Sequence, residues 1–304
     1  MGDFDRKATA EDVSAGFDLT GRHAIVTGAN TGIGLETARV LALRGASVTM
    51  ACRNLDKAHA ARDGILESNA AIEKDQLEVM RLDLGQLSQV REFARDFLAT
   101  SRPIHLLVNN AGVMLPDRRE TADGFEAHFG INHLGHFLLT RLLDERVRTS
   151  APARIINVSS DALHFASLTE SLEDLNWEKR RFSGWRSYGD SKLMNVLFTN
   201  ELNRRYASEG VVSNALHPGI VKTELARDQP WWMAAVGLLM LPMSKSPERG
   251  AATSVYLATD EALGREGAGY FADCAPGRVH GLSGNAALEN ALWRRSEDLV
   301  GLAS

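Results

Sequence analysis

Short apolar runs rich in β-branched residues alternate along most of the chain with longer stretches of helical periodicity. Such runs predict strands that are buried on both faces, and their alternation with helices is typical of a parallel sheet. The expected strands span 23–26, 47–52, 77–82, 104–109, 154–158, 211–216 and 269–271, and the expected helices span 33–44, 55–68, 87–100, 125–147, 188–208 and 246–259. The pattern predicts an α/β protein of Rossmann type, a doubly wound parallel sheet of about seven strands with helices on both faces.

A length of 304 residues is compatible with one domain or with two. The sequence has no Pro/Gly/Ser-rich linker, no internal repeat and no low-complexity tract, so we expect a single domain over residues 21–275. A polar N-terminal arm at 1–20 precedes this domain and an extension at 276–304 follows it. A polar, charge-rich insert at 161–187 interrupts the alternation of strands and helices.

The composition excludes several classes of protein. The chain carries 34 Lys and Arg against 39 Asp and Glu, and this formal net charge of −5 argues against nucleic acid as a partner. Two cysteines, Cys52 and Cys274, are too few for a disulfide framework or a Cys-rich metal site. The polar N-terminus lacks the apolar segment of a secretory signal, and the apolar run 230–243 is too short to span a bilayer. We therefore expect a cytoplasmic protein.

The first predicted strand ends in a glycine-rich turn, TGANTGIG at 27–34, which leads directly into a helix. Gly28 permits a tight turn, Gly32 lets the backbone approach a phosphate, and Gly34 lets the helix lie close to the sheet. The free N–H groups at the start of that helix can then bind a pyrophosphate. Glycines also mark plain turns, but the location in the first βαβ unit favours a nucleotide site. Its candidate residues are Gly28, Asn30, Thr31, Gly32, Ile33 and Gly34.

The ends of the second and third predicted strands should select the cofactor. An acidic residue after the second strand binds a ribose 2′-hydroxyl, whereas an arginine accommodates a 2′-phosphate. This chain has Arg53 and Asn54 there and no carboxylate, so we predict that NADP is preferred and that NAD is the alternative. A solvated loop arginine is the other interpretation of Arg53. Asp83, which precedes Leu84, either bonds the adenine amino group or is a plain turn aspartate.

A serine pair, a tyrosine and a lysine form the candidate catalytic group. Tyr188 and Lys192 are four residues apart, so their side chains share one face of a helix. A neighbouring ammonium group stabilises phenolate, so we expect the pKa of Tyr188 to lie below its ordinary value. Ser159 and Ser160 end the fifth strand, and the carboxyl ends of parallel strands line a ligand crevice. The YxxxK pattern is common on surface helices, and its place in this sheet is what makes it a candidate.

Taken in order, these motifs resemble those of the short-chain dehydrogenase/reductase family over about residues 20–275. The resemblance rests on TGANTGIG, NNAG at 109–112, Asn132, the serines at 159–160, YGDSK at 188–192 and Pro218-Gly219. ACRN at 51–54, NHLGHF at 132–137 and SNALHPG at 213–219 are most similar to the retinol dehydrogenase-like group and to related hydroxysteroid dehydrogenases. The long gap between Ser160 and Tyr188 is also a feature of that group.

The resemblance implies a role for each matching residue. Tyr188 is the implied catalytic acid–base, and Lys192 is implied to bind the nicotinamide ribose and to lower the pKa of Tyr188. Ser160 is implied to polarise the substrate oxygen, in preference to Ser159, because the second serine is the usual family position. Asn132 is implied to hold a water of the proton relay. The other implied cofactor contacts are Asn110, Ala111, Gly112, Pro218, Gly219, Val221 and Thr223.

The resemblance also implies an NAD(P)-dependent oxidoreductase that interconverts a bulky hydrophobic secondary alcohol and its ketone. A hydroxysteroid is the first choice of substrate, and retinol, retinal or another lipophilic carbonyl compound is the alternative. A nucleotide-sensing protein with little turnover is the alternative of another class. No catalytic metal is implied, and we interpret His133 and His136 as residues of helix packing.

The surroundings of the substrate follow from the same resemblance. Residues 224–245 are implied to form a substrate lid, and the apolar run 230–243 suits a lipophilic substrate. Membrane contact by this run is the less favoured alternative. The insert 161–187 is either part of a substrate rim or an inert surface excursion, and we expect the extension 276–304 to pack near the substrate end. The resemblance also implies a homodimer or homotetramer, formed through the two long helices at about 125–147 and 188–208.

Overall fold

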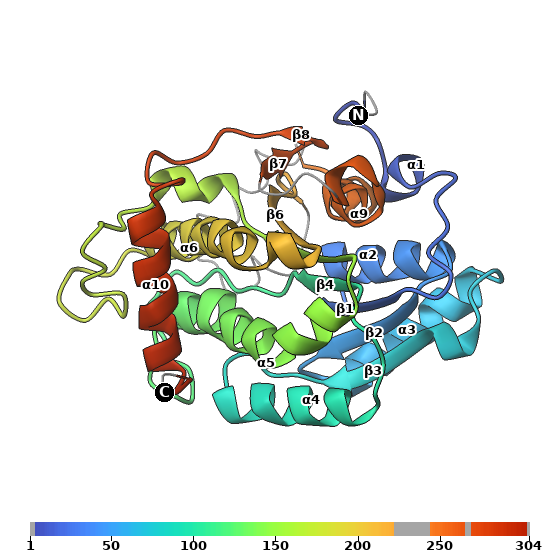
Figure 1. Ribbon diagram of the computed structural model, residues 1–304, viewed down its shortest axis with the longest axis horizontal. Helices are drawn as coiled ribbons and strands as arrows, with labels where there is room; N and C mark the ends of the chain where they lie inside the picture. Colours follow the sequence, from blue (N-terminus) through green and yellow to red (C-terminus); the bar gives the residue numbers. More distant parts are fainter. Residues whose placement is uncertain (1–3, 222–243, 265–268, 303–304) are drawn as a thin grey trace.

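The computed structural model describes residues 4–221, 244–264 and 269–302. Within these residues an eight-stranded sheet lies between layers of helices (Figure 1). The strands are β1 (His23–Thr27), β2 (Ser47–Cys52), β3 (Leu77–Arg81), β4 (Leu106–Asn109), β5 (Ala153–Val158), β6 (Val211–His217), β7 (Tyr270–Ala272) and β8 (Ala275–Pro276). Their order is β3-β2-β1-β4-β5-β6-β7-β8, and all neighbours are parallel except β7 and β8. The predicted Rossmann-type sheet is confirmed, with the short antiparallel β8 as an addition.

Helices cover both faces of the sheet because successive crossovers run first to one side of β1 and then to the other. One face carries α2 (Gly32–Leu43), α3 (Leu55–Ser68), α8 (Pro247–Gly250) and α9 (Ala252–Thr259). The other face carries α4 (Leu87–Ala99), α5 (His136–Thr149) and α6 (Gly184–Tyr206). Fully buried side chains such as Leu41 on the first face and Phe97 on the second form two separate cores. The inner strands β1, β2, β4, β5 and β6 are therefore buried on both sides, as their apolar sequences predict, whereas the edge strand β3 is partly exposed.

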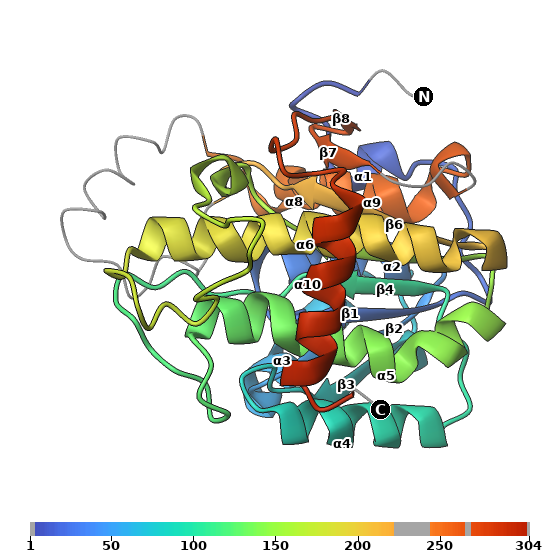
Figure 2. The same cartoon turned by 60° about the vertical axis from the view of Figure 1, so that its left-hand side comes forward.

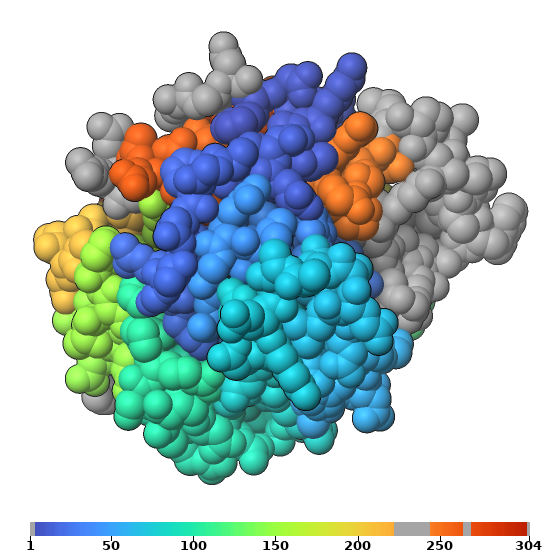
Figure 3. Space-filling model, turned by 90° about the vertical axis from the view of Figure 1, so that its right-hand side faces the viewer, coloured from blue at the N-terminus to red at the C-terminus, as the bar shows by residue number. Residues whose placement is uncertain are grey.

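The N-terminal segment packs against the first of these helix layers. Its short helix α1 (Ala10–Val13) lies against α9 and α2, and Figure 3 shows this segment next to the α8–α9 region. Arg39 of α2 donates to Glu11 at 2.6 Å, and Arg44 donates to the hydroxyl of Ser14 at 3.0 Å. The contacts tie the arm to the sheet's amino-terminal half.

A helix that the sequence analysis does not anticipate, α10 (Ala286–Leu299), crosses the outer side of α5 and α6 (Figure 2). Trp293 packs edge-on against Phe137 with ring centroids 5.2 Å apart, and Arg141 donates to Glu297 at 3.0 Å. Just before α10, Asn285 donates to Glu170 of the insert at 3.2 Å. The extension thus meets both the insert and the two long helices, and any dimer through those helices would include the outer side of α10.

Two helices differ from their predicted bounds near the candidate site. The expected helix 125–147 divides into a π-helical stretch, η2 (His128–Gly135), and α5. Helical periodicity in a sequence does not reveal such a local widening, which is common at functional sites. The helix with Tyr188 begins at Gly184, so Tyr188 lies in its second turn and not at its start.

The strand order reverses between β1 and β4, and such a switch point opens a ligand crevice at the carboxyl ends of the strands. Most of the predicted site residues follow β1, β2, β4, β5 and β6 at this edge. Most of the expected lid, including the whole run 230–243, and the implied cofactor contact Thr223 lie outside the described residues. None of the described helices is both long and apolar enough to cross a membrane.

Candidate active site

The glycine-rich turn joins β1 to α2 and contacts the loop that follows β4. Asn110 donates through its side chain to the carbonyl oxygen of Thr27 at 2.8 Å, and the hydroxyl of Thr27 accepts from the N–H of Ala111 at 2.9 Å. A Cβ atom at Gly34 would lie 2.4 Å from the side-chain nitrogen Nδ2 of Asn110 and 2.5 Å from the carbonyl oxygen of Gly28. Only glycine therefore allows α2 to begin this close to the two loops.

The start of α2 has the properties of a phosphate site. Thr31 is the N-cap residue, but its side chain accepts no hydrogen bond from the helix. The first N–H groups of the helix, which begins at Gly32, therefore remain available to an anion, and the helix dipole favours negative charge there. Asn30, Thr31, Gly32 and Ile33 are partly accessible, as a ligand contact requires. The residues present fit a dinucleotide pyrophosphate.

The predicted adenine side of the site is formed by the ends of β2 and β3. Arg53 is exposed, and its guanidinium forms no salt bridge with a carboxylate of the described residues. Asn54 caps α3, because its side chain accepts from the N–H of Lys57 at 2.9 Å. Asp83 accepts from the N–H of Gly85 at 2.9 Å and from Gln86 at 3.1 Å, which gives it a turn-forming role in this structure. The side chain of Leu84 is buried in the core, so it is not available as a cofactor contact.

The two adjacent serines after β5 have different environments. Ser159 is buried, and its hydroxyl donates to the carbonyl oxygen of Lys192 at 2.7 Å. Ser160 is partly accessible, caps the short helix η3 (Asp161–Phe165), and lies near enough to the phenol of Tyr188 to act on its pKa. The geometry therefore favours Ser160 over Ser159 as the residue that meets a substrate oxygen.

Lys192 and Asn132 lie next to Tyr188 at the carboxyl edge of β5. Lys192 Nζ lies 5.5 Å from the centroid of the Tyr188 ring and donates to the carbonyl oxygen of Val158 at 2.9 Å. Asn132, in η2, accepts from the N–H of Val113 at 2.8 Å and donates to its carbonyl oxygen at 3.0 Å. The structure thus brings Ser160, Tyr188, Lys192 and Asn132 together; their catalytic roles remain predictions.

The pKa of Tyr188 shifts in the direction opposite to the expected one. Burial of the phenol raises its pKa to about 12, and its interaction with Ser160 opposes that rise only in part. Burial also lowers the pKa of Lys192 to about 8, because the ammonium group is removed from water. Desolvation therefore sets the direction of the shift, and the prediction that the pKa of Tyr188 lies below its ordinary value is wrong.

Two buried residues that the sequence analysis does not single out, His128 and Glu126, support α6, the helix that carries Tyr188. His128 Nε2 accepts from the N–H of Leu115 at 2.8 Å, which leaves the proton on Nδ1, 2.9 Å from Glu126 Oε1. Desolvation raises the pKa of Glu126, but its interactions with His128 outweigh this, so that pKa lies below its usual value. The His128 ring packs edge-on against Tyr188 with centroids 5.9 Å apart. His128 thereby positions Tyr188 relative to the loop after β4.

An ion pair anchors the insert 161–187 to α6, the helix that carries Tyr188. Asp190, within the YGDSK motif, is buried and accepts from Arg180 at 2.8 Å and from the N–H of Ser167 at 2.6 Å. The Arg180 guanidinium also lies 3.5 Å from the centroid of the buried Trp177 ring. Burial raises the pKa of Asp190, and Arg180 counteracts that rise.

Replacing Arg180 with methionine should destabilise the protein in a pH-dependent way. Leaving the buried carboxylate without its guanidinium costs about 1–3 kcal/mol. The pKa of Asp190 in the folded protein lies above its value in the unfolded chain. Stability therefore falls as pH rises from the unfolded-state pKa to the folded-state pKa. Loss of Arg180 raises the folded-state pKa further, so the pH range over which stability falls extends upward. Urea unfolding should therefore show a larger loss at pH 8 than at pH 5. The exposed neighbour Arg181→Met is the matched control; equal losses for both variants, or a loss independent of pH, would contradict the assignment.

The strand ends beside Ser160 are joined by a second polar cluster. Tyr270 donates through its hydroxyl to Asp161 at 2.9 Å, and His217 Nε2 lies 3.4 Å from the other Asp161 oxygen. Burial lowers the pKa of His217, with the Asp161 charge acting against it. No local sequence signal marks this cluster, because its members come from the ends of different strands.

The predicted helix-packing histidines each have a separate partner. His133 Nε2 lies 3.0 Å from the hydroxyl of Ser296, and His136 Nε2 lies 2.9 Å from the hydroxyl of Thr27. Burial lowers the pKa of His133 to about 4 and that of His136 to about 3, so both rings are neutral near pH 7. Across the described ranges no group of three or more His, Cys, Asp or Glu side chains is placed to hold a metal ion.

The loop after β6 brings the remaining predicted cofactor residues to the same edge. Pro218 is buried and Gly219 is partly accessible. Val221 forms a parallel bridge with Lys245, and its side chain lies close to the position that a Cβ on Gly250 would take. At Gly112, in the loop after β4, an added Cβ would lie 3.5 Å from Lys192 Nζ.

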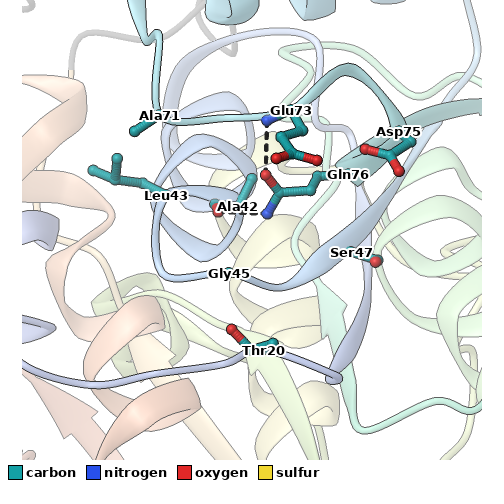
Figure 4. Close-up of a pocket in the computed structure, with 9 residues that line it drawn as sticks. All are labelled: Thr20, Ala42, Leu43, Gly45, Ser47, Ala71, Glu73, Asp75 and Gln76. Carbon is teal, nitrogen blue, oxygen red and sulfur yellow. Dashed lines mark hydrogen bonds between the residues drawn. The ribbon is translucent and has the colours of Figure 1, made fainter.

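A hollow of about 340 Å³ lies at the other edge of the sheet (Figure 4). Thr20 and Ser47, next to the starts of β1 and β2, line it together with Gln76 before β3. Gln76 donates to the carbonyl oxygen of Ala42 at 3.0 Å. Because parallel strands present their amino ends here, this hollow is separate from the candidate active site.

Comparison with known proteins agrees with this geometry. The model of the short chain dehydrogenase family matches residues 22–171. Retinol dehydrogenase 12 of Homo sapiens is 44% identical over 284 residues, which cover 93% of this chain and 88% of that protein. The WW domain-containing oxidoreductase of Gallus gallus is 40% identical over 98% of this chain and 72% of its own length.

Solved structures give the same result. The crystal structure of an uncharacterised protein from Mycobacterium paratuberculosis superposes with a TM-score of 0.76 at 35% identity and covers 95% of this chain and 97% of that one. A Beutenbergia cavernae protein, assigned as an NAD(P)-dependent gluconate 5-dehydrogenase and solved with NADP, has a TM-score of 0.65 at 26% identity and covers 84% and 96% of the two chains.

A nucleotide-binding sheet with a Ser–Tyr–Lys group at its carboxyl edge defines a class of nicotinamide-dependent oxidoreductases. The chain belongs to the short-chain dehydrogenase family. It is accordingly an NAD(P)-dependent oxidoreductase that acts on CH–OH groups. The predicted resemblance to this family and to its retinol dehydrogenase-like group is confirmed.

Proposed function

We propose that the protein interconverts a lipophilic alcohol of the retinol kind and its carbonyl compound, with NADP(H) as the preferred cofactor. The observation that carries the proposal is the meeting of the Ser160 hydroxyl, the Tyr188 phenol and the Lys192 ammonium group at the carboxyl edge of β5. A hydroxyl donor next to a buried phenol is suited to hold an alcohol or carbonyl oxygen and to move its proton.

The proposed roles follow from these positions. Ser160 holds the substrate oxygen, and Tyr188 gives a proton to it in reduction or accepts the proton in oxidation. Nicotinamide, when bound, supplies or accepts the hydride at the carbinol carbon, and its oxidised form brings a positive charge that favours phenolate. Lys192 lies where its ammonium group can bind the ribose, and Asn132 fixes the backbone of Val113 beside it.

The names of retinol dehydrogenases 12 and 11, which are 44% and 45% identical to this chain, support retinol or retinal as the substrate class. A hydroxysteroid remains the alternative within the same reaction. Following absorbance of the reduced nicotinamide at 340 nm with retinal, retinol, steroid ketones and hydroxysteroids tests both substrates. Turnover of steroids alone would contradict the retinoid proposal. Binding of NADPH without turnover of any alcohol or carbonyl compound would instead favour a nucleotide-sensing protein.

Replacing Arg53 with alanine should weaken the use of NADP and leave the use of NAD almost unchanged. A guanidinium paired with a 2′-phosphate contributes about 1.5–3 kcal/mol, which corresponds to roughly 10- to 150-fold in kcat/KM. The measurement is kcat/KM with each cofactor, and the exposed Arg95→Ala on α4 is the control. An equal loss with both cofactors, or a wild-type preference for NAD, would contradict this assignment.

A further inference from the structure

Two aromatic side chains next to the catalytic group are exposed to solvent. Phe165 is 64% exposed and Trp185 is 48% exposed, and they meet edge to face with ring centroids 6.5 Å apart. Contiguous apolar groups on a protein surface mark interaction sites, whereas a single exposed apolar residue is normal. We name Phe165 and Trp185 the aromatic rim.

The aromatic rim continues the face of α6 that carries the catalytic residues. Trp185, Tyr188 and Lys192 are three and four residues apart, so their side chains follow one another along that face. Lys192 is buried against Val158, Tyr188 is 8% exposed, and Trp185 is half exposed, so the face runs from the sheet out to solvent. Trp185 stands about 4.5 Å further along the helix axis than Tyr188.

Phe165 reaches the same place from the side of Ser160. Ser160 caps η3 by accepting from the N–H of Ala162 at 3.2 Å, and Phe165 ends that helix. Gly189 of α6 holds η3 close, because a Cβ there would lie 2.6 Å from the carbonyl oxygen of Ala162. The two residues of the aromatic rim are thus fixed relative to Ser160 and Tyr188 by the backbone contact of η3 with α6.

The site therefore has a polar inner end and an aromatic outer end. Ser160, Tyr188 and Lys192 surround the place of the reacting oxygen, and beyond them the surface presents two rings. Flat aromatic faces bind conjugated or aromatic groups well. An oxygen held at the inner end would place the apolar body of an elongated molecule against the rings.

We propose that the aromatic rim is the binding surface for the apolar body of the substrate, and that it selects elongated, unsaturated molecules with their oxygen at one end. This inference rests on the proposed function. The continuity of the rim with Tyr188 along α6 favours a substrate as its occupant; a membrane surface is the competing occupant, and the test includes it.

The experiment compares a long and a short aldehyde in the same protein. We expect Phe165→Ala and Trp185→Ala each to lower kcat/KM for retinal about ten-fold, because each removes a ring from contact with the apolar body. For hexanal, which barely reaches the rim, the loss should stay within about two-fold. Phe165→Leu and Trp185→Phe, which keep an apolar side chain, should recover most of the retinal activity. Leu55→Ala, an exposed apolar residue at the start of α3, should leave the retinal-to-hexanal ratio unchanged.

Each outcome separates the inference from the proposed function. If the wild-type protein reduces no aldehyde, the proposed function fails, and retinol binding followed by retinol fluorescence still tests the rim, with about ten-fold weaker binding expected for Phe165→Ala. If both aldehydes lose activity equally, the rim has no selective role and the inference is overturned. The inference also fails if Phe165→Ala and Trp185→Ala keep the wild-type ratio of kcat/KM for retinal to kcat/KM for hexanal but no longer float with phosphatidylcholine vesicles. That result would assign the aromatic rim to a membrane surface.

Discussion

Tyr188→Phe should lower kcat for carbonyl reduction by about 10²–10⁴-fold, the usual contribution of a positioned general acid or base. The phenol lies next to Ser160 and on the same helix face as Lys192. Without its hydroxyl, no side chain at this position can give a proton to the substrate oxygen. NADPH binding, followed by fluorescence, should change little because the ring and the helix remain.

Tyr206→Phe is the matched control for this variant. Tyr206 lies on the same helix, is buried to the same extent, and donates its hydroxyl to Asp144 at 2.9 Å far from the candidate site. Its loss should leave kcat close to the wild-type value. Retained turnover in Tyr188→Phe, or an equal loss in both variants, would show that the phenol of Tyr188 is not the proton donor.

The pH dependence of reduction bears on the same residue. Burial raises the pKa of Tyr188 to about 12 in the chain alone, so the phenol is fully protonated at neutral pH and ready to act as an acid. Oxidation of an alcohol needs the phenolate and therefore depends more strongly on the charge of the oxidised nicotinamide and of Lys192.

Trp293→Ala should lower the free energy of unfolding by about 3–5 kcal/mol, the range for removing a large buried aromatic side chain. Trp293 is fully buried in α10 and packs against Phe137 and Phe198 at centroid distances of 5.2 and 5.7 Å. The guanidinium groups of Arg141 and Arg205 lie 4.9 and 4.1 Å from its ring centroid. The substitution removes the side chain that joins α10 to α5 and α6.

The chain offers a control of the same residue type for urea unfolding of this variant. Trp185→Ala removes an exposed tryptophan and should change the free energy of unfolding by no more than about 0.5 kcal/mol. Similar stabilities for the two variants would mean that α10 does not contribute to the cooperative core. A large loss in Trp185→Ala would contradict its assignment to the aromatic rim.

The sheet could be predicted because each of its strands carries its own signal. Strands such as β2 and β6 are apolar along nearly their whole length, since helices cover both of their faces. The turn at Gly28–Gly34 likewise shows its requirements locally, through glycines at the positions of close backbone approach. The helix α10 was not expected, although it carries local helix signals in its cap Asn285 and in buried positions such as Leu288 and Leu292; its contacts with α6 depend on residues far away in the chain.

The candidate site, like the fold, has features that the sequence predicts and features that only the structure shows. The motifs identify Tyr188 and Lys192, whose spacing on a helix is local, and they leave Ser159 and Ser160 as neighbours. The structure separates the two serines by giving the Ser159 hydroxyl to the backbone of Lys192. It also overturns the expected direction of the Tyr188 pKa, because burial depends on everything that packs around the ring.

The sequence by itself determined the parallel sheet, the nucleotide turn and the Ser–Tyr–Lys group, because strand burial, backbone approach and helical spacing are written in neighbouring residues. Only the tertiary structure decided that Arg180 of the insert pairs with Asp190, that His128 supports Tyr188, and that Phe165 meets Trp185 beside the reacting group. Those contacts join segments that lie apart in the chain. Their free energy depends on distance and desolvation in the folded protein, which a local sequence pattern does not contain.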